Sequence, residues 1–144
     1  MSSKFAPLLL LLGLAAGIAA AEPLVEVHKD PNCGCCGRWI EHLRAEGFAV
    51  HVTDTGDLAA VKRAAGVPAA LGSCHTAMAD GYVIEGHVPA ADLRRLLAER
   101  PALRGLAVPG MPLGAPGMDY DGRRQPYATI AFDADGRQAV FQQH

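Results

Sequence analysis

The sequence contains no run of basic residues and no stretch in which basic and aromatic side chains alternate. Its 13 lysines and arginines are outnumbered by 15 aspartates and glutamates, so the formal net charge is −2. Proteins that bind nucleic acid gather positive charge on one surface to contact phosphates. The composition therefore argues against a nucleic-acid partner.

The sequence also has no long hydrophobic run, because its longest apolar stretch, residues 5–20, is short for a membrane span of roughly 20 residues. Lys4 precedes this stretch, and three alanines at 19–21 supply a small-residue cleavage site. These features predict a secretory signal peptide over residues 1–21 and a periplasmic protein with no membrane segment after cleavage. An uncleaved membrane anchor is the alternative.

Cleavage would leave residues 22–144, which are enough for one domain with its own core and too few for two. The loss of Lys4 would make the net charge one unit more negative. Cysteine is scarce, with only four in the chain. Outside the cytoplasm a thiol stays reduced only when something protects it, and a bound metal ion can do so.

Three of the four cysteines lie within residues 33–36, in the segment Asp-Pro-Asn-Cys-Gly-Cys-Cys-Gly. Residues 24–28 before them alternate apolar and polar side chains, and an apolar helical stripe follows them. The sulfurs are therefore expected at a helix N-terminus, with Asn32 as a candidate cap. The unpaired N–H groups and the helix dipole favour the thiolate there, which is the form that attacks disulfides or binds soft metals. A structural disulfide between Cys33 and Cys36 is the alternative.

The hydrophobic pattern predicts an α/β fold in the order β-α-β-α-β-β-α. The order implies that the first two strands are parallel with a right-handed crossover, and with cysteines at the first strand-to-helix junction it resembles the thioredoxin fold. The expected elements are strands at 24–28, 48–53, 73–78 and 82–85, and helices that run to about Glu46, from Thr55 or Asp57 to Gly66, and from Pro89 to Pro101.

Beyond Pro101 the composition changes. Residues 106–119 are rich in Gly and Pro and contain two Pro-Gly-Met triplets, which end at Met111 and Met118. Rigid turns could hold each sulfur toward one site, as an outer ligand or a gate; a hydrophobic plug is the alternative. Residues 127–141 predict a terminal β-hairpin, which must pack on the main sheet because an isolated hairpin is unstable.

The fourth cysteine, Cys74, begins the third predicted strand. In a thioredoxin-like fold the loop entering that strand lies beside the start of the first helix, so Cys74 and His75 would face the other three cysteines. The alternative is that Cys74 is a buried apolar residue. His28 and His87 are further candidate ligands, but each taken alone fits better as a surface or hydrogen-bonded histidine.

Thiolates, thioethers and imidazoles form a soft donor set. Such a set suits copper(I) or zinc and argues against magnesium or calcium. Zinc fits the spacing less well, because its structural sites usually take two pairs of ligands. Adjacent Cys35 and Cys36 chelate one ion awkwardly and bridge two or more ions more readily. The sequence therefore predicts a small thiolate-bridged copper cluster.

Four ordered motifs give the chain a resemblance to the bacterial exported family catalogued as domain of unknown function 411, which includes periplasmic copper-resistance proteins. The motifs are Cys-Gly-Cys-Cys at 33–36, Ser-Cys-His-Thr at 73–76, Gly-Tyr-Val-Ile-Glu-Gly-His-Val-Pro at 81–89, and the Pro-Gly-Met segments from 108 to 118. The resemblance implies a thioredoxin-like fold, copper at the cysteines and a part in copper or silver tolerance. The implied metal ligands are Cys33, Cys35, Cys36, Cys74, His75, His87, Met111 and Met118.

Three functions remain open from the sequence. The first is a periplasmic copper-binding protein that sequesters copper, passes it to efflux or chaperone proteins, or changes its redox state. The second is a thiol-disulfide oxidoreductase with Cys33 as nucleophile and Cys36 as resolving thiol. Against it, Cys35 would compete as a third thiol, and the proline that precedes the third strand of thioredoxins is missing, Pro68 being too early. The third is an exported domain stapled by two disulfides.

Overall fold

The structure is a computed structural model and describes residues 22–144, so the predicted signal peptide lies outside the described residues. Within the described part, no helix is long and apolar enough to cross a membrane. The elements are β1 (Leu24–Lys29), α1 (Gly34–Ala45), β2 (Ala49–Asp54), α2 (Leu58–Ala65), the 3-10 turn η1 (Ala69–Leu71), β3 (His75–Ala79), β4 (Tyr82–Gly86), α3 (Ala90–Glu99), β5 (Gly105–Val108), β6 (Ala128–Phe132) and β7 (Gln138–Gln143).

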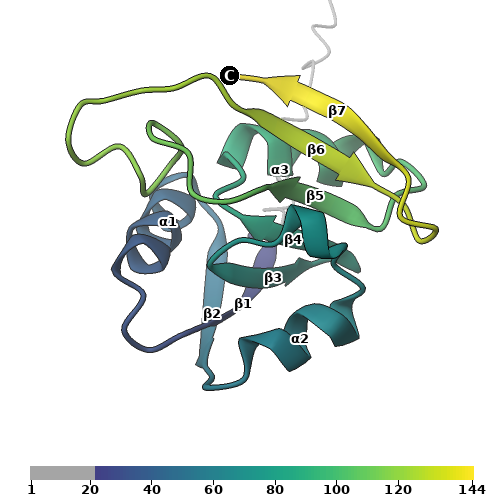
Figure 1. The fold of residues 1–144 in the computed structure, drawn as a ribbon, viewed down its shortest axis with the longest axis horizontal. Helices are drawn as coiled ribbons and strands as arrows, with labels where there is room; N and C mark the ends of the chain where they lie inside the picture. The colour runs from purple at the N-terminus through teal and green to yellow at the C-terminus, as the bar shows by residue number, and fades with distance from the viewer. Residues whose placement is uncertain (1–21) are drawn as a thin grey trace, which may run out of the picture.

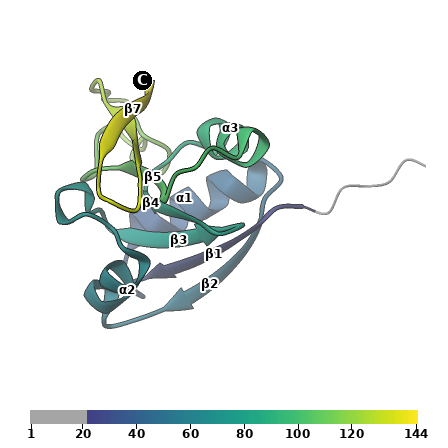
Figure 2. The same ribbon diagram turned by 90° about the vertical axis from the view of Figure 1, so that its right-hand side faces the viewer.

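The seven strands form one mixed sheet in the order β2-β1-β3-β4-β5-β6-β7 (Figure 1). β1 runs parallel to β2 and β4 parallel to β5, while the other neighbours are antiparallel. Figure 2 shows α1 and α3 on one side of the sheet and α2 on the other. The predicted α/β class is therefore confirmed, together with the parallel first pair of strands. The closer likeness to thioredoxin stays a prediction.

Strand β5 is the main departure from the predicted elements. Residues 106–108 were expected to open a Gly- and Pro-rich loop, yet Leu106, Ala107 and Val108 are fully buried in the middle of the sheet. Gly105 makes this pairing with β4 possible, because a Cβ there would lie 1.9 Å from the carbonyl oxygen of Val83. The Met-bearing loop thus begins after Val108, and β5 supplies the edge on which the predicted hairpin, β6 and β7, packs.

The start of α1 is fixed by core packing. Trp39, Ile40 and Leu43 of α1 are buried against the sheet, and Trp39 Nε1 donates to the carbonyl oxygen of Val88 at 2.9 Å.

Asn32 is not the cap of α1, so that prediction was wrong: Cys33 occupies the N-cap position and no side chain caps the helix. The Asn32 backbone instead donates to Asp30 Oδ1 at 2.8 Å, in a tight turn that brings β1 into α1.

Candidate metal centre

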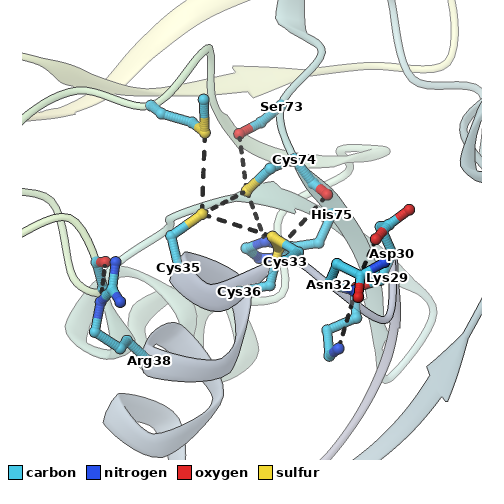
Figure 3. Close-up of a disulfide and its surroundings, with 12 residues drawn as sticks. Lys29, Asp30, Asn32, Cys33, Cys35, Cys36, Arg38, Ser73, Cys74 and His75 are labelled. Atoms are coloured by element: carbon cyan, nitrogen blue, oxygen red, sulfur yellow. Dashed lines mark hydrogen bonds between the residues drawn. A yellow bond between two sulfur atoms is a disulfide. The ribbon is translucent and has the colours of Figure 1, made fainter.

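The three clustered cysteines lie at the N-terminus of α1, as expected. Cys33 and Cys36 are joined by a disulfide with their Cα atoms 5.4 Å apart, and Cys35 is a free thiol (Figure 3). Cys36 is fully buried, whereas Cys33 and Cys35 are half-buried. In this state Cys35 is the only one of these three cysteines with a free thiol that can bind a metal ion, because the sulfurs of the other two are bonded to each other.

Cys74 lies against this group, as the sequence predicted. It occupies the loop before β3, and the antiparallel pairing of β1 with β3 brings that loop to the end of β1 where α1 begins. The Cys74 sulfur is 3.7 Å from that of Cys35, which in turn is 3.6 Å from that of Cys33. The four sulfurs all lie within 4.8 Å of one another.

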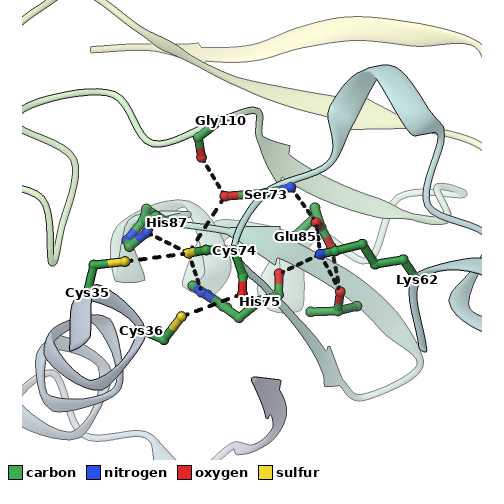
Figure 4. A network of polar contacts seen from close by, with 10 residues as sticks. Cys35, Cys36, Lys62, Ser73, Cys74, His75, Glu85, His87 and Gly110 are labelled. Carbon is green, nitrogen blue, oxygen red and sulfur yellow. Dashed lines mark hydrogen bonds and ion pairs between the residues drawn. The ribbon is translucent and has the colours of Figure 1, made fainter. Parts of the chain in front are cut away.

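Two histidines form a second group of potential metal ligands together with Cys74 (Figure 4). Its sulfur lies 3.3 Å from His75 Nδ1 and 3.0 Å from His87 Nε2. His87 Nδ1 donates to the carbonyl oxygen of Pro116 at 2.8 Å, which leaves Nε2 of the neutral ring as the acceptor that faces the Cys74 thiol. His75 stacks at a tilt on Trp39, with ring centroids 4.3 Å apart, and its Nε2 is a buried nitrogen without a hydrogen-bond partner among the described residues. Three potential ligand atoms therefore converge here.

Burial keeps these groups uncharged. It holds the pKa of His75 well below its usual value, with His87 and Lys62 nearby adding to the effect, and it also lowers the pKa of His87. Burial, together with neighbouring Cys35, raises the pKa of the Cys74 thiol to about 12. Neutral imidazole is the form that binds metal ions, whereas the thiol must lose its proton to do so.

The two methionines occupy different environments. The Met111 sulfur lies 4.0 Å from that of Cys35, and the residue is 53% exposed. Met118 is buried, and its backbone closes a turn with Gly114 and Ala115. Among the described residues only Met111 of the pair has a sulfur in contact with a cysteine, so Met118 fits the packing role that was the alternative.

The loop that carries both methionines is pressed onto α1 through Gly117. A Cβ at this position would lie 2.8 Å from both the Cys35 carbonyl oxygen and the Trp39 nitrogen, and the backbone has a φ of +86°. Arg38 Nε donates to the Gly117 carbonyl oxygen at 2.9 Å. This contact is what brings the Pro116 carbonyl to His87.

The sequence reasoning missed Lys62 and gave no role to Ser73 and Glu85, which it quoted only as parts of the family motifs; all three lie behind Cys74. The available signal was Glu85 itself, a carboxylate in the middle of the otherwise apolar strand β4, where every residue is buried. Such a carboxylate needs partners, and nothing in the sequence says which. His28, by contrast, is not among the residues whose ligand atoms group with the cysteines.

Comparisons with known proteins show a family and two solved structures that this chain resembles. The profile described as "Protein of unknown function, DUF411" matches residues 71–118, which include Cys74 and both histidines. A solved structure of copper resistance protein CopG in its form 2 is 46% identical, with a TM-score of 0.82, and the match covers 85% of this chain and 98% of that one. The form 1 structure is 48% identical, with a TM-score of 0.81 and the same coverage. No curated protein sequence gives a significant match.

The identity and coverage are high enough to assign the chain. The second of the two ligand groups, Cys74 with His75 and His87, lies within the residues that the family profile matches. The chain belongs to the DUF411 copper-resistance family.

Proposed function

We propose that this chain is a periplasmic copper-binding protein for copper or silver resistance that holds copper(I) for sequestration, transfer or redox change. The observation that carries the proposal is the convergence of four cysteine sulfurs within 4.8 Å, with two histidine nitrogens grouped on one of them. Sulfur and imidazole donors are the set that copper(I) prefers. Zinc shares these ligand types and is the weaker candidate because the crowded cysteines do not form two separate pairs.

The metal takes the form of a thiolate-bridged cluster in this proposal. Cys33, Cys35, Cys36 and Cys74 would supply the sulfurs, with His75, His87 and Met111 as further ligands, whereas the buried Met118 packs inside its loop. Because Cys33 and Cys36 share a disulfide in the structure, the four-thiolate set requires its reduction. Two electrons from a dithiol donor and two protons would convert the disulfide to two thiols, which then lose their protons to bind the metal.

The predicted leader over residues 1–21 supports the periplasmic location. Copper efflux or chaperone proteins of that compartment are the proposed partners, since a resistance protein must pass its metal on or store it. Met111 and Cys35 form the exposed side of the site and offer the route of exchange.

The test is copper(I) stoichiometry of the reduced mature chain by native mass spectrometry. We expect more than one copper per chain, and fewer in Cys36→Ser and in Cys74→Ser. His51→Gln, which alters an exposed histidine of β2, is the control and should bind as the parent does. Full stoichiometry in both cysteine variants would refute the site, and at most one copper per chain in the parent would refute the cluster.

A second candidate function is favoured by the disulfide. Cys33 and Cys36 are paired with C-x-x-C spacing at a helix N-terminus, which is the arrangement of a thiol-disulfide oxidoreductase. Cys33 is the more exposed of the two sulfurs and would be the nucleophile after reduction. Copper-free protein that reduces a disulfide substrate catalytically, and loses this activity in Cys33→Ser, would establish it; absence of turnover would remove it.

A further inference from the structure

A buried ion pair lies directly behind the cysteine group. Glu85 of β4 is fully buried and pairs with Lys62 of α2, whose side chain is 21% exposed. The carboxylate also accepts from the Ser73 backbone nitrogen at 2.6 Å and from the Thr76 hydroxyl at 2.7 Å. Figure 4 shows Lys62, Ser73 and Glu85 meeting beside the segment that carries Cys74.

The contacts bracket Cys74 on both sides. On the N-terminal side Glu85 holds the Ser73 N–H. On the C-terminal side Lys62 Nζ donates to the Thr76 hydroxyl at 3.0 Å and to the His75 carbonyl oxygen at 3.5 Å. Since successive strand residues point to opposite faces, the Thr76 side chain lies with the ion pair on the α2 face, while His75 points toward α1. The segment that carries Cys74 is thus held by hydrogen bonds from Lys62 of α2 and Glu85 of β4.

The same network reaches the Met-bearing loop. Ser73 Oγ donates to the Gly110 carbonyl oxygen, and the Gly110 nitrogen donates to the Gly72 carbonyl oxygen at 3.1 Å. Met111 follows directly in the chain. Gly86 allows the close approach, because a Cβ there would lie 2.5 Å from the Ser73 side chain. Ser73 therefore links the position of Cys74 to that of Met111.

We propose that the Lys62–Glu85 ion pair is a positioning device, which fixes Cys74 and, through Ser73, Met111 against the sulfurs of α1. Buried ion pairs contribute little net stability and can be replaced by apolar residues of similar size, so stability alone does not account for this pair. The inference rests on the proposed copper site as the reason for the device, whereas the geometry itself can be tested without copper.

The experiment compares Lys62→Met/Glu85→Gln with Lys62→Met/Glu85→Leu in the mature chain with its Cys33–Cys36 disulfide intact. Neither double variant carries the charge pair, and the two differ in whether residue 85 can accept the Ser73 N–H. The readout is the rate at which diamide couples Cys35 to Cys74, followed by peptide mass spectrometry. We expect about tenfold slower coupling in the Leu form and substantial rescue in the Gln form, because misplacement of reacting groups slows an intramolecular step.

Asp92→Asn is the matched control. Asp92 is another buried carboxylate, bonded to Thr129 and His144 rather than to the cysteine loop, so its neutralisation should leave the coupling rate unchanged. Equal coupling in the wild type and both double variants would overturn the proposal. Should the Leu form not fold, amide exchange of Ser73 in the wild type decides instead: a protected amide supports the clamp, and exchange at the rate of a free loop amide overturns it.

Copper binding distinguishes failure of the positioning role from failure of the proposed copper-binding function. Loss of copper(I) affinity in the Leu form, with rescue in the Gln form, supports positioning of the metal ligands. A wild type that couples Cys35 to Cys74 rapidly yet takes up no copper(I) would overturn the proposed function, and with it the purpose of the device. If the wild type binds copper(I) and both double variants bind it equally well, the positioning role is overturned and the proposed function stands.

Discussion

His87 Nε2 lies 3.0 Å from the Cys74 sulfur, while the other nitrogen of the same ring donates to the Pro116 carbonyl. The ring is therefore held in one tautomer and one orientation before any metal arrives. Hydrogen bonds of this kind raise the basicity of a histidine ligand and set its direction. The backbone of the Met-bearing loop thus takes part in the metal centre without supplying the ligand atom.

We predict that His87→Gln lowers copper(I) affinity by at least roughly 10-fold, because loss of even an outer partner of a metal ligand costs about 10- to 100-fold. The measurement is competition with a chromophoric copper(I) chelator on reduced protein. His51→Gln makes the same chemical change at an exposed position of β2 and should have no effect. Unchanged affinity in His87→Gln would remove this histidine from the ligand set.

Copper(I) binding should weaken as the pH falls. Burial raises the pKa of the Cys74 thiol to about 12, so this sulfur is protonated in the metal-free protein at neutral pH and must release its proton to bind. Each proton displaced lowers the apparent affinity about tenfold per unit of pH decrease. Affinity titrations at several pH values measure the slope, which Cys74→Ser should reduce. A slope that Cys74→Ser leaves unaltered would contradict the assignment.

Gly117→Ala should destabilise the fold by about 2–3 kcal/mol, because it combines a positive φ with a clash against the backbone of α1. Gly122→Ala is the control: its φ is +76° but no atom lies within 4 Å of the added Cβ, so only the roughly 1 kcal/mol conformational cost remains. Urea unfolding of both variants gives the difference. Equal destabilisation would show that the loop does not press on α1.

Met111→Leu should retain the copper stoichiometry and slow copper uptake from a small-molecule complex by a few fold, since the substitution keeps the volume and removes the exposed thioether beside Cys35. Stopped-flow absorbance follows the uptake. The buried Met118 provides the comparison, and Met118→Leu should take up copper at the parental rate. Equal rates in all three proteins would leave Met111 without a role in exchange.

Metal-free protein should lose stability in mild acid partly through His42. Its Nε2 accepts from the Ala90 nitrogen at the start of α3, and burial lowers its pKa from the usual 6.5. The unfolded chain then binds the proton more readily than the folded one, so this contribution is intact above about pH 6.5 and is lost as the pH falls below it. His42→Gln should give a shallower decline of the urea midpoint between about pH 7.5 and pH 5.5. An identical decline would contradict this.

The sequence was most informative where local signals and topology coincided. The cysteines at 33–36 followed an alternating strand and preceded a helical stripe, and the strand order then carried Cys74 and His75 to them. The sequence was less informative where tertiary packing determines the secondary structure or the role of a residue. Residues 106–108 look like loop beside many glycines and prolines, yet the space between β4 and β6 makes them a strand. Two identical Pro-Gly-Met triplets differ in role because only one lies beside Cys35.

The sequence also could not show which residue pairs with the buried carboxylate of Glu85. Glu85 stands out within an apolar strand, but Lys62 is one of several basic residues on short helices, and only the fold places it within reach. The same holds for the Pro116 carbonyl, whose role depends on backbone direction and not on residue type.

The sulfurs of this centre come from two segments nearly 40 positions apart in the chain, one at the start of α1 and one at the start of β3. An ion shared between them would act as a tether across the edge of the sheet. Release of the metal would then require its bonds to both segments to break, so the lifetime of bound copper would depend on the two segments together rather than on the strength of any one bond.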